Sequence, residues 1–382
     1  MSRRLLRVVA RPAFKNQAVN PYNARIYGGI EHYGIHVVEY GPAALLARPD
    51  IVHVHWPESS FNHGLLGARL TTRALLVALK SARRRGAKVL WTMHNLRAHE
   101  RRYPAIEAVF WKEFLPLVDA TIALSAPSLA LAQRERPEIA DKPAFIVRHP
   151  DYRGAYPDDI DRTEARRRLG LPQDTEAVIT FFGHIKAYKN VPALIETVRA
   201  MSPNLVLLVA GRARDSGVME RIQEASGNDP RIRLTLRHIE DHETQVFLRA
   251  ADLVALPYHD ILNSGTALLA LSFDRPVWFS VDDASVHATT GTTGTTGAVD
   301  ATSATGTVGA TSPAGALAHD LQTVVGSEWV HYGPLSRGDL QSSLQRSRQL
   351  PERTSGEHLR AFSPAEVVKA TADVFRSVAE TL

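Results

Sequence analysis

Short apolar runs alternate with amphipathic segments along most of the chain. In the first part we expect strands at 5–10, 35–40, 50–58, 88–95, 119–125 and 144–149. A second series is expected to contain strands at 177–182, 205–210, 232–237, 252–257 and 276–280, separated by amphipathic helices. Strands that alternate with helices are typical of parallel sheets with helices on both faces. The pattern therefore predicts an α/β protein with two doubly wound, Rossmann-like domains that face each other across a cleft.

The same pattern divides the chain. We predict an N-terminal domain over 1–155, a charged linker over 156–175 and a C-terminal domain over 176–362. A last helix, 363–382, is expected to pack back on the N-terminal domain. Residues 288–316 are almost only Ala, Thr, Gly, Ser and Val, a composition that cannot build a core. We expect a disordered insertion there.

Composition narrows the class of protein. No apolar run approaches the ~18 to 20 residues that a membrane span needs. The absence of cysteine excludes disulfides, thiolate zinc sites and cysteine nucleophiles, and it fits a cytoplasmic protein.

The net charge of +5 is unevenly spread, because residues 67–86 interleave leucines with six basic side chains: Arg69, Arg73, Lys80, Arg83, Arg84 and Arg85. A basic amphipathic helix can lie on an anionic membrane surface, and a solvated helix face is the alternative. No nucleic-acid-binding motif accompanies the charge, so we expect no nucleic-acid partner. The sequence predicts a peripheral protein on the inner face of the cell membrane.

The clearest candidate chemistry lies where a strand near residue 256 gives way to an apolar helix at Asn263-Ser-Gly-Thr266. Asn263 or Ser264 can cap the helix, and Gly265 allows a ligand to approach the backbone. The free N–H groups and the positive end of the helix dipole suit a phosphate group. An ordinary capped helix is the alternative.

A second strand end, Phe181 to Asn190, carries Gly183 and two lysines that can reach over a diphosphate. Together the two loops predict a donor diphosphate and nucleotide site, with extra charge from a third strand end. Its expected residues are Gly183, Lys186, Tyr188, Lys189, Arg212, Tyr258, Asn263, Ser264, Gly265 and Thr266.

These two motifs resemble the nucleotide-sugar half of GT-B glycosyltransferases, and more narrowly of the xanthan-type GDP-mannose:glycolipid 4-β-D-mannosyltransferases. In the first half, Asn20-Pro-Tyr22, His53-x-His-Trp-Pro-Glu58 and Thr92-x-His-Asn-Leu-x-x-His-Glu100 have counterparts there, in order. The resemblance covers most of the chain except the Thr/Gly-rich insertion.

The sequence departs from the family pattern at four positions. Lys186 stands where Arg is usual, and Asn190 where Gly is usual. Ile261 and Leu269 occupy the positions of the paired glutamates of many retaining enzymes, which favours an inverting reaction.

The resemblance implies a metal-independent enzyme that moves a hexose to a polyprenyl-diphosphate-linked oligosaccharide in exopolysaccharide or cell-surface glycan assembly. GDP-mannose is the expected donor, and no cofactor is expected. An inverting transfer needs a general base, for which Glu58 and Glu100 are the candidates, with His94 at the donor sugar. The acceptor is expected to contact Asn20, Tyr22, His55, Trp56 and His99.

Alternatives remain at this point. His53 and His55 have a possible metal-ligand spacing, but without a carboxylate pattern we favour hydrogen-bonded histidines at a strand end. A UDP-sugar-dependent or retaining transferase, an epimerase-like or phosphorylase-like GT-B protein, and a non-catalytic nucleotide-sugar-binding protein also fit the sequence.

Overall fold

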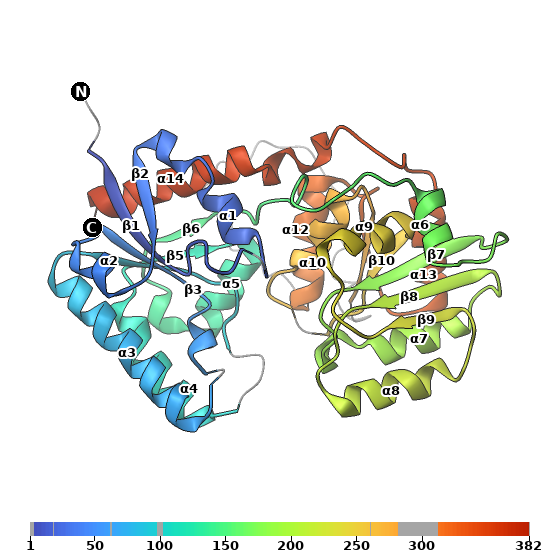
Figure 1. Ribbon diagram of the computed structural model, residues 1–382, viewed down its shortest axis with the longest axis horizontal. Coiled ribbons are helices and arrows are strands. Elements are labelled where there is room, and N and C mark those ends of the chain that lie inside the picture. Colours follow the sequence, from blue (N-terminus) through green and yellow to red (C-terminus); the bar gives the residue numbers. More distant parts are fainter. Residues whose placement is uncertain are drawn as a thin grey trace, which may run out of the picture. The chain divides into compact units, whose positions relative to one another are not determined.

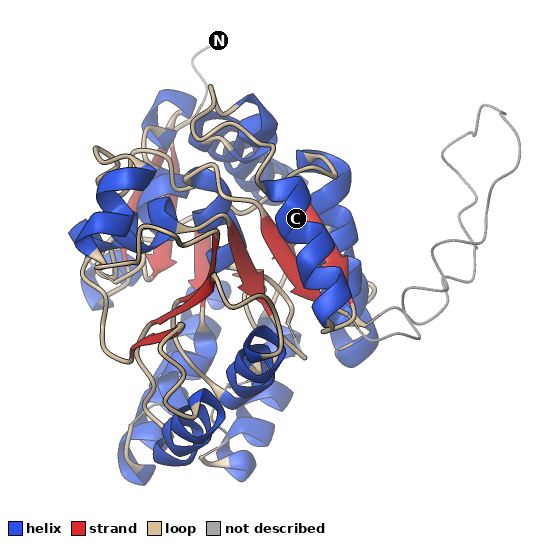
Figure 2. Cartoon of the chain, turned by 90° about the vertical axis from the view of Figure 1, so that its right-hand side faces the viewer, coloured by secondary structure: helices blue, strands red, loops and turns tan. Residues whose placement is uncertain are grey.

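A computed structural model describes residues 4–17, 19–61, 63–97, 102–259, 261–281 and 312–381. The chain forms two compact units, Met1–Asp151 with Arg360–Leu382 (unit 1) and Tyr152–Leu359 (unit 2). In both, strands are flanked by helices, as Figure 2 shows. Among the described residues, no helix combines the length and apolar character needed to cross a membrane.

Unit 1 is built on a six-stranded parallel sheet with the order β2-β1-β3-β4-β5-β6. Its strands are β1 (Leu6–Arg11), β2 (Ile35–Glu39), β3 (Ile51–His55), β4 (Lys88–Thr92), β5 (Ala120–Ala123) and β6 (Ala144–Ile146). Every residue of β3 is buried, because helices cover both faces of this central strand.

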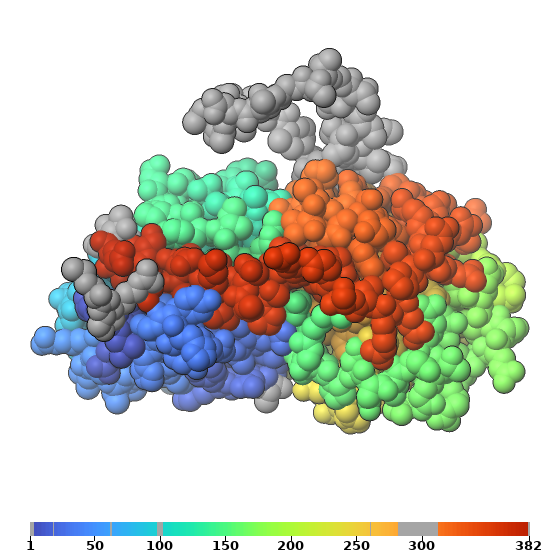
Figure 3. All heavy atoms as spheres, turned by 90° about the horizontal axis from the view of Figure 1, so that it is seen from above, coloured from blue at the N-terminus to red at the C-terminus, as the bar shows by residue number. Residues whose placement is uncertain are grey.

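The helices of unit 1 lie on two sides of the sheet (Figure 1). They are α1 (Tyr22–Tyr27), α2 (Pro42–Leu46), α3 (Leu65–Arg84), α4 (Pro104–Phe114), α5 (Ala126–Glu135) and the C-terminal α14 (Pro364–Thr381). Apolar residues of α14, including Val367, Phe375 and Val378, join the buried cluster around α1 and β1. In Figure 3 the C-terminal segment, in red, lies against the N-terminal residues, in blue. The last helix therefore completes the core of unit 1.

Unit 2 contains a second six-stranded parallel sheet, ordered β12-β11-β10-β7-β8-β9. Its strands are β7 (Ala177–Phe182), β8 (Leu205–Ala210), β9 (Ile232–Thr235), β10 (Leu253–Leu256), β11 (Val277–Ser280) and β12 (Val330–Gly333). The helices are α6 (Arg162–Arg168), α7 (Val191–Arg199), α8 (Ser216–Ser226), α9 (Asp241–Ala250), α10 (Gly265–Ser272), α12 (Pro313–Val325) and α13 (Arg337–Ser347).

Two sequence expectations differ from the structure. Most of the segment expected as a linker belongs to unit 2, since α6 packs on α9 and both Arg162 and Arg166 pair with the buried carboxylate of Asp252. The disordered insertion was expected to extend to residue 316, but its last residues belong to a helix: Ser312 caps α12, and Ala314 is buried. The alanines and glycine at this end of the segment pack as a helix face, which composition alone did not indicate. Residues 282–311 lie outside the described part of the chain.

Each sheet has one point where the strand order reverses, between β1 and β3 in unit 1 and between β7 and β10 in unit 2. Connections leave the carboxyl ends of such neighbouring strands in opposite directions, which opens a crevice where α/β proteins bind their ligands. The candidate residues follow these strands, so the fold collects them at two places.

Candidate active site

In unit 2, the loops that follow β7 and β10 are joined to each other. The backbone N–H of His259 donates to the carbonyl of Tyr188 at 3.0 Å, and the rings of Tyr188 and Tyr258 meet edge to face with centroids 6.1 Å apart. The two predicted halves of the diphosphate site therefore form one structure at the reversal point of the sheet.

Lys189 lies at the centre of this structure. Its side chain is buried, and Nζ lies 4.9 Å from the centroid of the Tyr258 ring and 5.7 Å from that of Phe181. Burial, with a further contribution from Lys186, lowers the pKa of Lys189 to about 7. No carboxylate of the described residues forms an ion pair with it. A buried cation without a carboxylate partner is suited to an anionic ligand.

Gly183 brings the backbone close to Lys189 and to α10. A Cβ at this position would lie 3.2 Å from Thr266 Oγ1 and 3.9 Å from Lys189 Nζ, and its φ of +103° disfavours any side chain. A Cβ at Gly211, which follows β8, would overlap the carbonyl oxygen of Gly183. The two glycines thus let the backbone pack closely beneath the lysine and the threonine, and we call this backbone, Gly183 with Gly211, the glycine strip.

The N-terminus of α10 lies on the other side of the candidate diphosphate site from the loop after β7. Ser264 caps the helix by accepting from the N–H of Ala267 at 3.1 Å, which leaves its O–H as a donor. Gly265 and Thr266 are the first two residues of the helix, whose N–H groups have no partner within it. The pKa of His184 is lowered, first by burial and then by the charges of Lys189 and Lys186, which indicates a positive potential at this edge.

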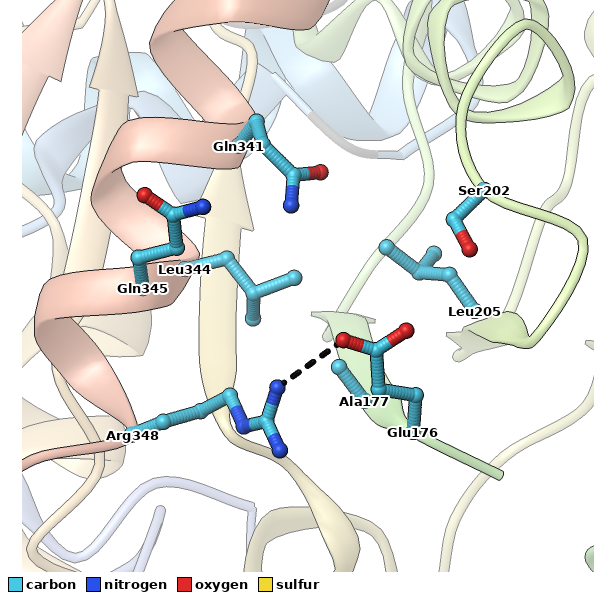
Figure 4. A pocket seen from close by; sticks show the side chains of 8 residues that line it. All are labelled: Glu176, Ala177, Ser202, Leu205, Gln341, Leu344, Gln345 and Arg348. Atoms are coloured by element: carbon cyan, nitrogen blue, oxygen red, sulfur yellow. Dashed lines mark hydrogen bonds and ion pairs between the residues drawn. The ribbon is translucent and has the colours of Figure 1, made fainter. Parts of the chain in front are cut away.

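The hollow shown in Figure 4 lies elsewhere, at the amino end of β7. Glu176 and Arg348 bridge it with an ion pair of 3.1 Å, and Leu205 and Leu344 line it. Because it is at the opposite edge of the sheet from the glycine strip, it cannot contribute to a ligand site at the carboxyl ends of the strands.

In unit 1, Glu58 is buried in a 3-10 turn, Pro57–Phe61, directly after β3. Oε1 accepts from Asn95 Nδ2 at 2.6 Å, whereas the buried Oε2 has no hydrogen-bond partner within the described residues. Burial raises the pKa of Glu58 to about 7, although Asn95 and Arg11 both oppose the shift. A carboxylate with this pKa can accept a proton near neutral pH.

Next to it, aromatic and imidazole side chains pack around His94. Trp56 stacks on the His94 ring with centroids 4.0 Å apart, and Tyr22 meets that ring edge to face at 4.7 Å. His149 lies against Tyr22, also at 4.7 Å. Trp56 adopts a φ of +42°, an unfavourable conformation for a tryptophan, which places its ring over His94.

Similarity to known proteins shows to which family the chain belongs. No protein-family model matches the chain. The chain is 30% identical over 268 residues to the GDP-mannose:glycolipid 4-β-D-mannosyltransferase of Xanthomonas campestris pv. campestris, an alignment that covers 69% of this chain and 70% of that protein. It belongs to this family of GT-B glycosyltransferases.

Solved glycosyltransferase structures share the fold. The sucrose-phosphate synthase of Thermosynechococcus elongatus superposes with a TM-score of 0.63 at 15% identity, covering 99% of this chain and 100% of that one. Anabaena Alr3699/HepE in complex with UDP and glucose superposes with a TM-score of 0.61 at 13% identity, covering 98% and 100%. At these identities the likeness establishes the fold alone.

For this GT-B glycosyltransferase, the structure places the predicted acceptor residues as follows. His55 is fully buried and both ring nitrogens are engaged, Nε2 with Tyr27 and Nδ1 with His94. Tyr22 is only 2% exposed, and its ring packs between those of His94 and His149. The side chain of Asn20 accepts from the N–H of Tyr22 at 3.0 Å, and α1 begins one residue later than expected.

Other predicted residues of the glycosyltransferase are placed as follows. Arg212 is exposed at the end of β8, where its carbonyl accepts from the N–H of Ile185 at 3.0 Å. His99 and Glu100 lie outside the described residues, so the second candidate base stays a prediction. No group of three or more potential metal ligands occurs among the described residues.

Sequence reasoning missed several residues that the glycosyltransferase places at these sites. Asn95 follows His94 in a recognised motif, and its position at a strand end was a usable signal. Gly211 opens the basic segment after β8 and carried the same signal. Tyr27 lies inside α1, and nothing in the local sequence indicates that its hydroxyl reaches β3.

Proposed function

We propose that this glycosyltransferase transfers mannose from GDP-mannose, with inversion, to a polyprenyl-diphosphate-linked oligosaccharide. The observation that carries nucleotide-sugar binding is the convergence of Gly183, Lys189 and the N-terminus of α10 at the reversal point of the unit 2 sheet. The choice of GDP-mannose as donor and of a glycolipid as acceptor is supported by the similarity to the Xanthomonas GDP-mannose:glycolipid mannosyltransferase.

In this proposal the diphosphate of the donor lies on the glycine strip. Lys189 neutralises its charge, and the N–H groups of Gly265 and Thr266 hold its oxygens, which stabilises GDP as it leaves. Lys186 and Arg212 add positive charge at the rim. Glu58 of unit 1 removes the proton from the acceptor hydroxyl, and His94 contacts a sugar oxygen.

The donor is tested with a panel of nucleotide sugars in thermal unfolding and transfer assays. We expect GDP-mannose to stabilise the protein by about 2.7 kcal/mol when present at about 100 times its Kd. GDP-glucose and UDP-glucose serve as controls for the sugar and the base. If only UDP-glucose stabilised the protein and supported transfer, UDP-glucose and not GDP-mannose would be the donor. Consumption of the nucleotide sugar without acceptor would indicate an epimerase.

We also propose that α3 holds the enzyme on the membrane that carries its lipid-linked acceptor, on its inner face. Leu66, Leu70 and Val77 share one face of α3 and are 70%, 60% and 58% exposed. Arg69 and Arg73 lie along one edge of this stripe, and the helix contains no acidic residue. An apolar stripe with a basic border fits an anionic lipid surface.

Arg83 is less available than its sequence position suggested, because it pairs with Asp119 at 2.7 Å. The sharper test therefore replaces Arg69 and Arg73 by Ser. Since a basic residue near an anionic surface contributes about 1 kcal/mol, we expect roughly 30-fold weaker binding to vesicles containing phosphatidylserine. A variant with Arg221 and Arg233 replaced by Ser loses the same charge from exposed sites in unit 2. Equal losses for both variants would remove α3 as the docking surface.

A further inference from the structure

A continuous series of hydrogen bonds runs through the buried side of the unit 1 site. Thr92 Oγ1 bonds to His53 Nε2 at 2.7 Å, and His53 Nδ1 bonds to the hydroxyl of Tyr27 at 2.8 Å. The same hydroxyl bonds to His55 Nε2 at 2.7 Å, and His55 Nδ1 bonds to His94 Nε2 at 3.0 Å. Phe375 of α14 closes the series off, with its ring 5.2 Å from that of His53.

The three imidazoles in this series are neutral. Burial lowers the pKa of His53 to about 3 and those of His55 and His94 well below the usual value. A neutral imidazole has one N–H, so one nitrogen donates while the other accepts, and a tyrosine hydroxyl donates once. If the Tyr27 hydroxyl both donates and accepts, the series has two arrangements, with every group donating either towards His94 or towards Thr92. Donation from both His53 and His55 to Tyr27 would leave the buried Tyr27 hydrogen without an acceptor in the series, which is costly.

The burial of the Thr92 hydroxyl decides in which direction the groups donate. Thr92 is 1% exposed, and within the described part of the chain its hydroxyl has His53 as its single hydrogen-bond partner. Donation towards Thr92 would leave the hydroxyl hydrogen buried without an acceptor, which is costly. Donation from Thr92 gives an acceptor to every hydrogen from Thr92 through His55, and it leaves His94 Nδ1–H as the last donor of the series. We propose that Thr92 and Tyr27 fix His53, His55 and His94 with their protons on Nδ1, so that His94 acts as a hydrogen-bond donor through Nδ1.

This arrangement gives His94 a defined role. A neutral imidazole protonated on Nδ1 donates to a ligand oxygen from that atom and does not act there as a base, which leaves the proton of the acceptor hydroxyl to Glu58. Thr92 and Tyr27 are positioning residues, because they act through His94. That the ligand oxygen belongs to a sugar rests on the proposed function, whereas the proton positions do not.

The proton positions are tested on the full-length enzyme without substrate. In the ¹⁵N spectrum of histidine-labelled protein, we expect the His53, His55 and His94 rings to be protonated on Nδ1, with assignments from His94→Gln and the corresponding variants. Thr92→Ser keeps the hydroxyl and should keep this pattern. Thr92→Val, of similar shape, should shift part of the His94 population to Nε2–H. A wild-type His94 protonated on Nε2 would overturn the inference, whether or not the valine variant folds.

Kinetics then separate the inference from the proposed function. We expect Thr92→Val to lower kcat/KM for mannosyl transfer by roughly three- to tenfold, with Thr92→Ser close to wild type. A protein that transfers no mannose but has all three protons on Nδ1 would contradict the proposed function and leave the hydrogen-bond series established. Equal rates for the valine and serine variants would show that the series does not act through His94.

Discussion

Glu58→Gln is expected to lower kcat for mannosyl transfer by about 10²- to 10⁴-fold and to leave donor binding unchanged. The amide keeps the shape of the side chain and can still bond to Asn95, but it cannot accept a proton. Initial rates at saturating donor and acceptor, with the donor Kd measured separately, check both parts. Glu107→Gln is the control, because Glu107 is also buried but bonds to Trp111 within α4. Removing the charge of Glu107 should only lower the pKa of Glu58, which leaves the base ionised.

The pH profile gives the same test a second readout. Because the pKa of Glu58 is raised to about 7, the base is ionised above pH 7, and kcat/KM should fall about tenfold per pH unit below it. Asn95 stabilises the carboxylate, so Asn95→Ala should move this limb to higher pH.

Stability helps to separate a chemical effect from misfolding. A carboxylic acid whose pKa is raised on folding destabilises the protein as the pH rises from its unfolded value through about 7. The glutamine variant escapes this cost, so at pH 8 it should be at least as stable as the wild type. A variant that folds normally and keeps activity within threefold would exclude Glu58 and direct attention to Glu100.

Much of the fold could be predicted from the sequence because buried parallel strands are short apolar runs. β7 and β8 match their expected bounds, and most other strands differ by a few residues at their ends. The end of the Thr/Gly-rich segment could not be placed, since Ala314 and Ala318 are buried by packing on a sheet that the local composition does not reveal.

The residues of the candidate site also fall into those that the sequence could indicate and those that it could not. Residues in the loops that follow strands, such as Gly183, Lys189 and Glu58, could be proposed from the sequence because the carboxyl ends of parallel strands collect such loops at one edge. Residues that act through tertiary contacts could not. The bond from Tyr27 to both His53 and His55 depends on how α1 packs over β3, and no sequence period encodes that contact.

Lys189→Met should weaken binding of GDP-mannose by at least about 30-fold, since truncating one partner of a buried charge pair costs about 2–5 kcal/mol. Methionine is unbranched and can keep the contacts with the rings of Tyr258 and Phe181. Folding lowers the pKa of Lys189, which means that the charged form destabilises the folded enzyme below the lysine's unfolded pKa. The methionine variant should therefore be no less stable at pH 7, and a loss of affinity cannot be attributed to unfolding.

The pH dependence of binding tests the same residue without a mutation. With a pKa of about 7, Lys189 is mostly charged at pH 6 and mostly neutral at pH 8, so the affinity for GDP-mannose should fall roughly tenfold between these values. The nucleotide sugar is the better probe than GDP, because a terminal phosphate titrates near pH 6 (pKa ~6) and would add its own dependence. Lys189→Met should bind weakly and equally at both pH values. Lys186→Met should keep a pH dependence but move it to higher pH, because the charge of Lys186 contributes to lowering the pKa of Lys189. A wild-type affinity that stays constant from pH 6 to pH 8, together with an unchanged Kd in the methionine variant, would mean that the donor diphosphate does not bind at Lys189.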